Sequence, residues 1–305
     1  MKLQHTFVIT LIILCVPLAQ AADDDIQSSI DSCNKAIAAG DAFQALAYAE
    51  RVLKQDKSNR SALLCKGRAH GATGQYKEAL AALEAAEKLS ATPLEHMVAL
   101  TLTGNVYRSA KQFPEALDSY RKSLALARTG KDKRFERINL NQIGDTLMDK
   151  NEPDPALESY LAGGKLANNG NEHGDSYARI ASTYNRLAQH DKAIEFQIKA
   201  VLAEEGAGDF DHYANAKLEL GRIYTAAKEF PNAEKTLDKI IATSKQEGSA
   251  YWEAKGDYYL ALAKVANGQP QPARALLNDA QRICKEIGAL ELGDQIAQAL
   301  QNLSH

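Results

Sequence analysis

The side chains that most often carry chemistry are scattered along this 305-residue chain. None of its seven histidines stands in an HExxH pair, and none lies near a cysteine at metal-ligand spacing. No G-x-S-x-G elbow or P-loop is present, and Gly206 and Gly208 lack the third glycine and the preceding strand of a dinucleotide-binding turn. The residues therefore predict that the protein is not an enzyme and uses no metal or cofactor.

The densest group of potential ligands is acidic and consists of Glu204, Glu205, Asp209, Asp211 and His212. Oxygen ligands with intervening glycines are what calcium prefers. Their spacing fits no known calcium loop, however, and a solvated acidic linker explains the same residues. We therefore expect a linker between two structural units here.

The first 21 residues have the features of a signal peptide. Lys2 precedes an apolar run, residues 7–16, and small residues end the segment at Ala21. The run is about half of the roughly 20 residues that cross a bilayer, so we expect no membrane span in the mature chain. The alternatives are a retained anchor or a lipid attached to Cys15. The prediction is a periplasmic or secreted protein, cleaved near Ala21.

Charge and composition restrict the class of partner. The net charge is only −3, and lysines are interspersed with acidic residues, so no basic stripe is available to neutralise phosphates. Nucleic acid is therefore not an expected partner. Alanine is frequent, aromatic residues make up 7% of the chain, and no stretch alternates apolar and polar residues over the length of a strand. This composition favours closely packed helices.

One alanine recurs at steps of 34 to 40 residues, within similar segments such as 74–80 and 111–117. The recurring alanines are Ala45, Ala79, Ala116, Ala156, Ala193, Ala233 and Ala273. Such a period is typical of a solenoid. Twelve residues earlier stand Gly67, Gly104, Gly144 and Gly221, with Ala181 and Ala261 in two other units. For each repeat, this pattern predicts a first helix that packs closely at the small residue, then a tight turn, and then a second helix that begins near the alanine.

Helix start and stop signals follow the same period. Pro114 and Pro231 stand where a first helical turn tolerates a missing N–H. Glycines recur after the second helices, where we expect left-handed caps: Gly130, Gly170, Gly206, Gly248 and Gly288. Residues 290–303 predict a closing helix.

These patterns resemble the tetratricopeptide repeat family, through Gly67…Tyr76…Ala79…Ala86 and Gly104…Tyr107…Ala116…Tyr120. The resemblance covers about residues 26–288 and is closest to long-repeat members. The short signal peptide and the absence of other targeting signals suggest an exported bacterial protein. It implies an all-α fold: a right-handed α-α superhelix, or solenoid, of about seven helical hairpins plus a C-terminal capping helix. The implied divisions are a signal peptide (1–21), the solenoid (22–288), and the capping helix with its tail (289–305).

The resemblance also implies a concave groove, lined by the first helix of each unit, that binds a peptide or partner protein. Transfer of the groove-facing positions gives Arg68, Asn105, Arg108, Asn141, Asp145, Ser182, Asn185, Arg186, Asn215, Arg222 and Tyr258. Thr101, Met148, Leu218 and Lys255 occupy further positions of the same kind. Asparagine amides can hold an extended backbone, and arginine suits carboxylates. The alternative is that these are ordinary exposed polar side chains, some paired with Asp145, Asp149 or Asp175.

The resulting hypothesis is a non-enzymatic adaptor that holds a peptide or partner protein in the groove and serves an assembly process of the cell envelope. The alternative is a structural module that self-associates through apolar residues of the closing helix, such as Ile296 and Leu300. Cys33 and Cys65 fall at nearly equivalent points on two successive first helices. They could form a disulfide in an oxidising compartment, or remain two separately buried thiols.

Overall fold

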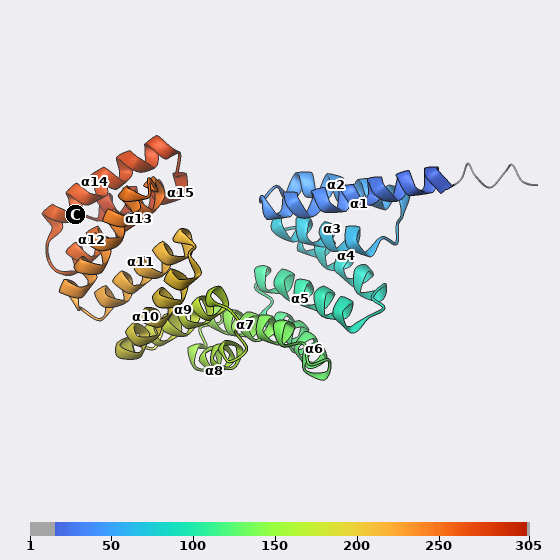
Figure 1. The fold of residues 1–305 in the computed structure, drawn as a ribbon, viewed down its shortest axis with the longest axis horizontal. Coiled ribbons are helices and arrows are strands. Elements are labelled where there is room, and N and C mark those ends of the chain that lie inside the picture. The colour runs from blue at the N-terminus through green and yellow to red at the C-terminus, as the bar shows by residue number, and fades with distance from the viewer. Residues whose placement is uncertain (1–15, 304–305) are drawn as a thin grey trace, which may run out of the picture. The chain divides into compact units, whose positions relative to one another are not determined.

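The computed structural model describes residues 16–303, with side chains from residue 25 onward, and every element in this part of the chain is an α-helix (Figure 1). The predicted signal peptide lies outside the described residues, except for the backbone of its last six residues at the start of α1. The first helices are α1 (Val16–Ala38), α2 (Ala42–Gln55), α3 (Arg60–Ala72), α4 (Tyr76–Lys88), α5 (Pro93–Ser109), α6 (Phe113–Thr129) and α7 (Lys133–Asp149). They are followed by α8 (Pro153–Gly164), α9 (Gly170–Arg186), α10 (His190–Ala207), α11 (Phe210–Ala226), α12 (Phe230–Gln246), α13 (Ala250–Ala266), α14 (Pro270–Ile287) and α15 (Leu290–Asn302).

The helices group into two compact units, residues 1–146 and residues 147–305. Within unit 1, α1 packs on α2, α3 on α4, and α5 on α6. Within unit 2, α9 packs on α10, α11 on α12, and α13 on α14. Figure 1 shows these pairs as hairpins joined by short turns. The expected all-helical solenoid of hairpins is confirmed, and α15 is the expected closing helix.

The recurring alanines explain why the chain folds back at regular intervals. All seven are completely buried. Each is the fourth residue of the second helix in its hairpin, as with Ala79 in α4 and Ala116 in α6. A methyl group at this point lets the two helices of a hairpin approach closely, because any larger side chain would separate them. The prediction that the alanine opens the second helix is therefore confirmed.

The glycine of the first helix also allows the two helices of a hairpin to pack closely. A Cβ atom on Gly67 would lie 2.6 Å from Leu83, and one on Gly221 would lie 2.5 Å from Leu237. The side chain that fills the space comes in each case from the second helix, sixteen residues later. The first helix therefore packs tightly against the second one, as the repeat predicts.

The predicted glycine stop signals are only partly right. Gly248 and Gly288 have the left-handed backbone expected of a helix cap, with φ of 69° and 71°. Gly130 is helical with φ −79°, Gly170 begins α9, and Gly206 lies inside α10. The left-handed residues after α6 and α10 are Lys131 and Gly208, which are neighbours of the predicted glycines. The same conformation also recurs in the turn inside each hairpin, at Gly40, Gly74, Lys111, Asn151, Ala188, Lys228 and Gly268. A short turn between antiparallel helices needs this conformation, and lysine or alanine adopts it at some cost.

A buried polar network ties the third hairpin to α7. The hydroxyl of Thr101 lies 3.0 Å from that of Ser123 and donates to Oδ1 of Asn139 at 3.1 Å. The amide of Asn139 donates to Ser123 and to the backbone oxygen of Phe135, at 2.9 and 2.8 Å. These partners offset the cost of placing three polar side chains in the core of unit 1.

The two apolar residues of the closing helix that were expected to support self-association are packed against the rest of unit 2. Ile296 is completely buried, and Leu300 packs against the core made by α13 and α14. The expectation that both are exposed is wrong, because α15 turns its apolar side towards the last hairpin. Leu290, at the start of this helix, is 80% exposed.

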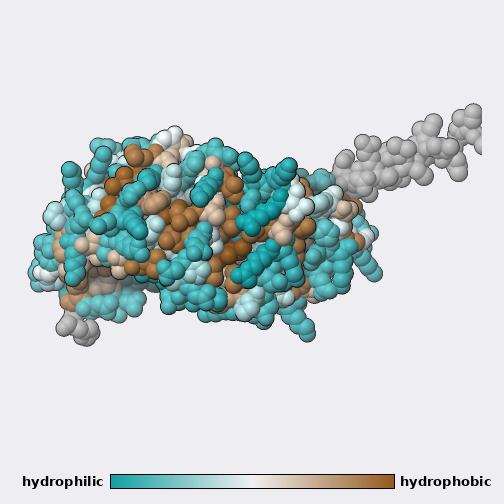
Figure 2. Space-filling view, turned by 90° about the horizontal axis from the view of Figure 1, so that it is seen from below, coloured by the Kyte–Doolittle hydropathy of each residue, from teal (hydrophilic) through white to brown (hydrophobic). Residues whose placement is uncertain are grey.

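Hydrophobic side chains also reach the surface in the gaps between rows of hydrophilic ones, on the face shown in Figure 2. Among residues 16–303, no helix combines the length and the hydrophobicity that crossing a bilayer requires.

Candidate binding surface on the first helices

The predicted site residues lie on the first helices of the hairpins, which contact one another within each unit. In unit 1, α3 packs on α1 and α5, and in unit 2, α11 packs on α9 and α13. We call these surfaces the first-helix face of unit 1 and the first-helix face of unit 2, and describe each separately.

The first-helix face of unit 1 contains a hollow of about 230 Å³. Two of the predicted residues, Arg68 and Asn105, line it together. The remaining lining comes from apolar or small residues of α1, α3 and α5, together with Leu83 of α4: Ile37, Gly71, Ala72, Leu83, Leu102, Val106 and Ser109. The combination of an apolar floor with a few polar groups is typical of a surface that binds side chains of a partner.

Three cations on these faces are held by amide oxygens of the preceding hairpin in the same unit. Arg68 donates to Oδ1 of Asn34 at 3.0 Å, and Arg186 donates to Oδ1 of Asn151 at 2.7 Å. Lys255 donates to Oδ1 of Asn215 at 3.4 Å.

An amide oxygen orients a cation without neutralising it, so each of these side chains keeps its full charge. None of the three forms an ion pair with a described carboxylate, whereas burial lowers the pKa of both Arg68 and Lys255. A ligand carboxylate would supply the missing counter-charge and offset the cost of that burial.

Two other predicted arginines are already paired. Arg108 lies 3.3 Å from Asp145 and also donates to Gln142, and Arg222 lies 2.7 Å from Glu219. The expected pairing of Arg108 with Asp145, which belong to successive hairpins, is therefore present. Their carboxylate partners neutralise part of their charge, so these two arginines should attract an anionic ligand less strongly than Arg68 or Arg186.

The side-chain oxygens of three predicted asparagines already have hydrogen-bonding partners or neighbours. Asn215 is exposed and uses its oxygen for Lys255. Asn105 accepts a hydrogen bond of 2.7 Å from the hydroxyl of Tyr120, and the oxygen of Asn185 lies 3.1 Å from Nδ1 of His190. Their amide N–H groups remain the part of these side chains that could bind a peptide backbone. Ser182 is exposed.

One set of predicted positions is wrong. Asn141 is 7% exposed, Thr101 8% and Leu218 completely buried, so none of them offers an open surface. Each stands three residues before the packing glycine of its helix, which is one turn away on the same side. The residues one and four positions after the small residue, such as Asn105 and Asn185, point outward instead.

An aromatic cluster on the first-helix face of unit 2 was not predicted. The ammonium of Lys255 lies 4.9 Å from the ring centre of Trp252, and 6.0 Å from those of Tyr251 and Tyr259. Arg222 lies 5.8 Å from the ring of Tyr259. The predicted residue Tyr258 is half-buried beside Tyr259. Rings stabilise a cation without neutralising it, so Lys255 can still attract an anion.

A signal for this cluster exists in the sequence. Tyr251, Trp252, Lys255, Tyr258 and Tyr259 follow the spacing of one helix face, and Trp252 is the single tryptophan of the chain. Large aromatic residues on one helix face are typical of protein interfaces, and Tyr251 of this cluster is 43% exposed.

The acidic residues at the end of α10 and the start of α11 form neither of the arrangements expected for them. Glu204 is 7% exposed and fills the space beside Gly174, where the absence of a side chain makes room for its carboxylate. Burial raises the pKa of Glu204, and His212 lies 3.8 Å away. Asp209 caps α11 by accepting from the backbone N–H of His212. The expectation of a solvated linker is therefore wrong for Glu204, and no three His, Cys, Asp or Glu side chains within the described chain converge as metal ligands.

A disulfide links Cys33 of α1 to Cys65 of α3, with the two Cα atoms 6.4 Å apart. Both cysteines are buried in the N-terminal core of unit 1, whereas Cys284 is a buried free thiol in α14. The bond would hold the first two hairpins together.

We expect one free thiol per chain when a protein that begins at Ala22 is denatured without reductant. A thiol reagent would then modify Cys284 alone, and a Cys284→Ser variant would give no signal. Three thiols in the parent chain, and two in the variant, would show that Cys33 and Cys65 are not bonded.

Comparisons with known proteins identify the repeat. Models of the tetratricopeptide repeat match residues 34–92, 65–131 and 174–205. The heat shock protein STI1 of Saccharomyces cerevisiae is 26% identical over 186 residues, which are 60% of this chain and 30% of that protein. The chain therefore matches less than a third of the length of this relative.

Solved structures agree on the fold. A signal-transduction ATPase with a tetratricopeptide repeat sensor from Pyrococcus horikoshii has a TM-score of 0.71 at 16% identity, over 92% of this chain and 45% of that one. The apo form of RapI has a TM-score of 0.60 at 17% identity, over 80% of this chain and 97% of that one. A Rap protein complexed with competence and sporulation factor has a TM-score of 0.51 at 14% identity, over 92% and 98%. At these identities the likeness concerns the fold: an all-helical solenoid that carries tetratricopeptide repeats.

Proposed function

We propose that this repeat protein is a non-enzymatic adaptor that binds a carboxylate-bearing segment of another protein on its first-helix faces. Tetratricopeptide repeat proteins generally mediate protein–protein interactions. The observation that carries the more specific proposal is the set of cations held by amides, namely Arg68, Arg186 and Lys255. They are oriented by their neighbours, and none of them forms an ion pair with a carboxylate in the described part of the chain.

The remaining polar groups suit an extended segment. The amides of Asn105 and Asn185 can donate to backbone oxygens, and the rings around Lys255 offer flat contact area to apolar side chains. One structural relative, a Rap protein, is known in complex with competence and sporulation factor. This supports ligand binding as a use of the fold.

The proposed place of action is the bacterial periplasm or the cell exterior, in an assembly process of the envelope, and the proposed subclass is the long-repeat type. The support is the signal-peptide pattern of residues 1–21 and the disulfide between Cys33 and Cys65, a bond that persists in oxidising compartments. The steps of up to 40 residues between recurring alanines support the long-repeat assignment.

Site-specific photocrosslinking tests the proposed surface. A photoreactive amino acid at Ser182 or Asn215, both exposed on the first-helix face of unit 2, should capture the same protein repeatedly from envelope extract. The same group at Lys235, which is exposed on the second helix α12, should not capture it. Capture at all three positions alike would contradict the proposal.

Removing the cations should abolish this capture. We expect the triple variant Arg68→Gln, Arg186→Gln and Lys255→Gln to lower the crosslinking yield at least tenfold, because the ligand carboxylates lose their counter-charges. The matched control is Lys235→Gln, Arg282→Gln and Lys285→Gln, which loses the same net charge from α12 and α14. Equal yields from both triples would show that the effect comes from overall charge and not from this surface.

A further inference from the structure

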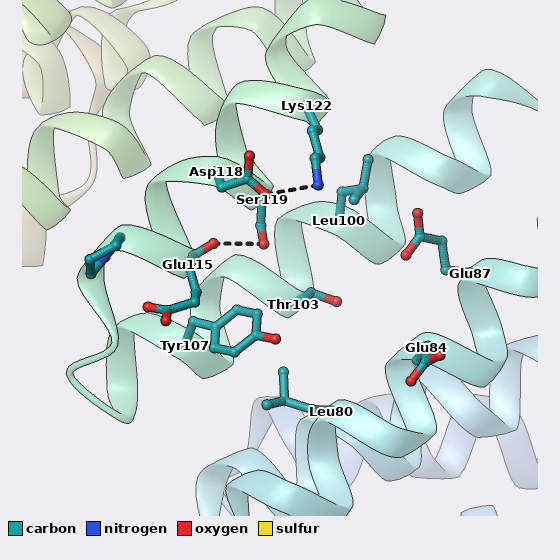
Figure 3. A pocket seen from close by; sticks show the side chains of 11 residues that line it. Leu80, Glu84, Glu87, Leu100, Thr103, Tyr107, Glu115, Asp118, Ser119 and Lys122 are labelled. Atoms are coloured by element: carbon teal, nitrogen blue, oxygen red, sulfur yellow. Dashed lines mark hydrogen bonds and ion pairs between the residues drawn. The ribbon is translucent and has the colours of Figure 1, made fainter.

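A second and larger cavity lies in unit 1, between α4, α5 and α6. Its volume is about 560 Å³, within the range of roughly 300–1,000 Å³ that is typical of ligand pockets. Figure 3 shows Leu80, Glu84 and Glu87 of α4 on one side and Glu115 and Asp118 of α6 on the other. Thr103 and Tyr107 of α5 lie between them. We call this cavity the acidic pocket.

The acidic pocket is separate from the first-helix face. Helix α5 contributes Leu100, Thr103 and Tyr107 to the pocket, whereas Leu102 and Asn105 line the hollow on the first-helix face. The helical repeat of 3.6 residues places these two sets on nearly opposite sides of α5. A ligand in the acidic pocket would therefore leave the first-helix face of unit 1 accessible.

The lining is strongly negative, with four carboxylates and one ammonium group. Glu84 pairs with Lys88 at 2.7 Å, and Asp118 pairs with Lys122 at 2.8 Å. Both pairs are exposed and are therefore readily exchanged for a better partner. Glu87 and Glu115 form no ion pair with any residue in the described part of the chain. The negative field reaches Lys122, whose pKa is raised mainly by Asp118 and also by Glu87.

The floor of the pocket is apolar. Leu80, Leu100 and Pro114 line it together with the half-buried ring of Tyr107. Arginine and lysine side chains have long apolar stems that pack on such surfaces and charged heads that reach towards carboxylates. The ring of Tyr107 can also stabilise a guanidinium group placed over it. A bare metal ion would gain nothing from this apolar area.

We propose that the acidic pocket binds an arginine-bearing segment of a partner protein, with the apolar stem on Leu80, Leu100 and Tyr107 and the guanidinium among the four carboxylates. The volume accommodates an arginine together with a neighbouring apolar residue. Unit 1 would then carry two binding surfaces of opposite charge preference. This proposal does not depend on the function proposed above, because the two surfaces share no residue.

Binding of short peptides tests the proposal directly. The probe is acetyl-Leu-Arg-Arg-Leu-amide, titrated into the ¹⁵N-labelled chain while amide resonances are followed. We expect the shifts to concentrate at Leu80, Thr103, Tyr107 and Asp118. The matched peptides with two glutamates or two alanines in place of the arginines should bind at least tenfold more weakly. Equal binding of the alanine peptide, or shifts spread over both units, would overturn the proposal.

Variants of the pocket separate a local effect from the effect of overall charge. We expect the triple variant Glu84→Gln, Glu87→Gln and Glu115→Gln to bind the arginine peptide at least tenfold more weakly than the parent. Its melting temperature should not fall, since these side chains lie at the pocket surface. The control triple is Glu286→Gln, Glu291→Gln and Asp294→Asn on α14 and α15, which should leave binding unchanged. If both triple variants weakened peptide binding equally, the proposal that the peptide binds in the acidic pocket would be refuted.

Replacing the single cation of the pocket should have the opposite effect. We expect Lys122→Gln to bind the arginine peptide at least threefold more tightly, because the ligand no longer competes with Lys122 for Asp118. Unchanged or weaker binding by this variant would contradict the role given to the carboxylates.

Discussion

The Gly104→Ala variant is expected to lose about 1–3 kcal/mol of stability, although it adds only a methyl group and raises helix propensity. The added Cβ atom would lie 2.5 Å from Cε1 of Tyr120. The ring has no space to yield, because Tyr120 is completely buried and its hydroxyl donates to Asn105 at 2.7 Å. Either the ring or the whole of α6 must move away from α5, and both movements leave gaps in the core.

Denaturation of two glycine variants measures this effect. Gly206→Ala is the matched control, because Gly206 lies inside α10 and a Cβ atom there meets nothing within 4 Å. We expect this control to be neutral or more stable by up to about 1 kcal/mol, as helix propensity predicts. The two substitutions should therefore shift the urea midpoint in opposite directions. Shifts of the same sign and size would show that Tyr120 does not depend on Gly104 for its position.

The Gly104→Ala substitution should also change the first-helix face of unit 1. Tyr120 holds the oxygen of Asn105, so displacing the ring would free this amide to rotate. The same glycine that allows close packing of α5 on α6 thus fixes one side chain of the hollow on the first-helix face. Packing and binding are coupled here through a single contact.

The Asp257→Asn variant should be more stable than the parent at pH 8 by as much as about 3 kcal/mol, and equally stable at pH 4. Asp257 is 6% exposed, and burial raises its pKa to about 6 despite the opposing charge of Lys245. Glu253, Asp279 and Asp238 raise the pKa further. An unfolded aspartate has a pKa of about 3.9.

The direction of the pH dependence follows from these two pKa values. The folded state holds the proton of Asp257 more tightly than the unfolded state does. The stability associated with this group is therefore fully present below about pH 4 and is lost as the pH rises through about 6. Asparagine carries no charge, so the variant should not show this loss.

Urea denaturation between pH 4 and pH 8 measures this difference. The control is Asp294→Asn, an exposed aspartate of α15, which should leave the pH profile of the parent unchanged. A variant that is less stable than the parent at every pH would show instead that the carboxylate of Asp257 is required as an acceptor.

Several parts of the fold were predictable because they depend on local spacing. The buried alanines and the closing helix follow from a period of 34 to 40 residues and from helical geometry, which any hairpin must obey. The packing glycines follow from the same period. The left-handed residues were harder to place, because Lys111 and Ala188 adopt a conformation that their residue types do not indicate.

The outward-facing positions were predictable only in part. Arg68 and Asn105 line a hollow and remain candidates for binding, whereas Asn141 and Leu218 are buried on the packed side of their helices. Glu204 was expected in solvent and is buried, because Gly174, thirty residues earlier, leaves room for its carboxylate. Contacts of this kind join residues whose separation in sequence carries no signal of their proximity.

The sequence by itself determined the repeated hairpins of this protein, because the residues that let two adjacent helices pack are close along the chain and recur at a regular step. Only the tertiary structure decided what those hairpins present to a partner. It placed Arg68 and Lys255 beside neutral amides and Arg108 beside a carboxylate. It also placed two glutamates in the acidic pocket without an ion pair to any described residue. The physical reason is that the charge available to a ligand depends on the neighbours of each side chain in space, and most of those neighbours belong to other helices.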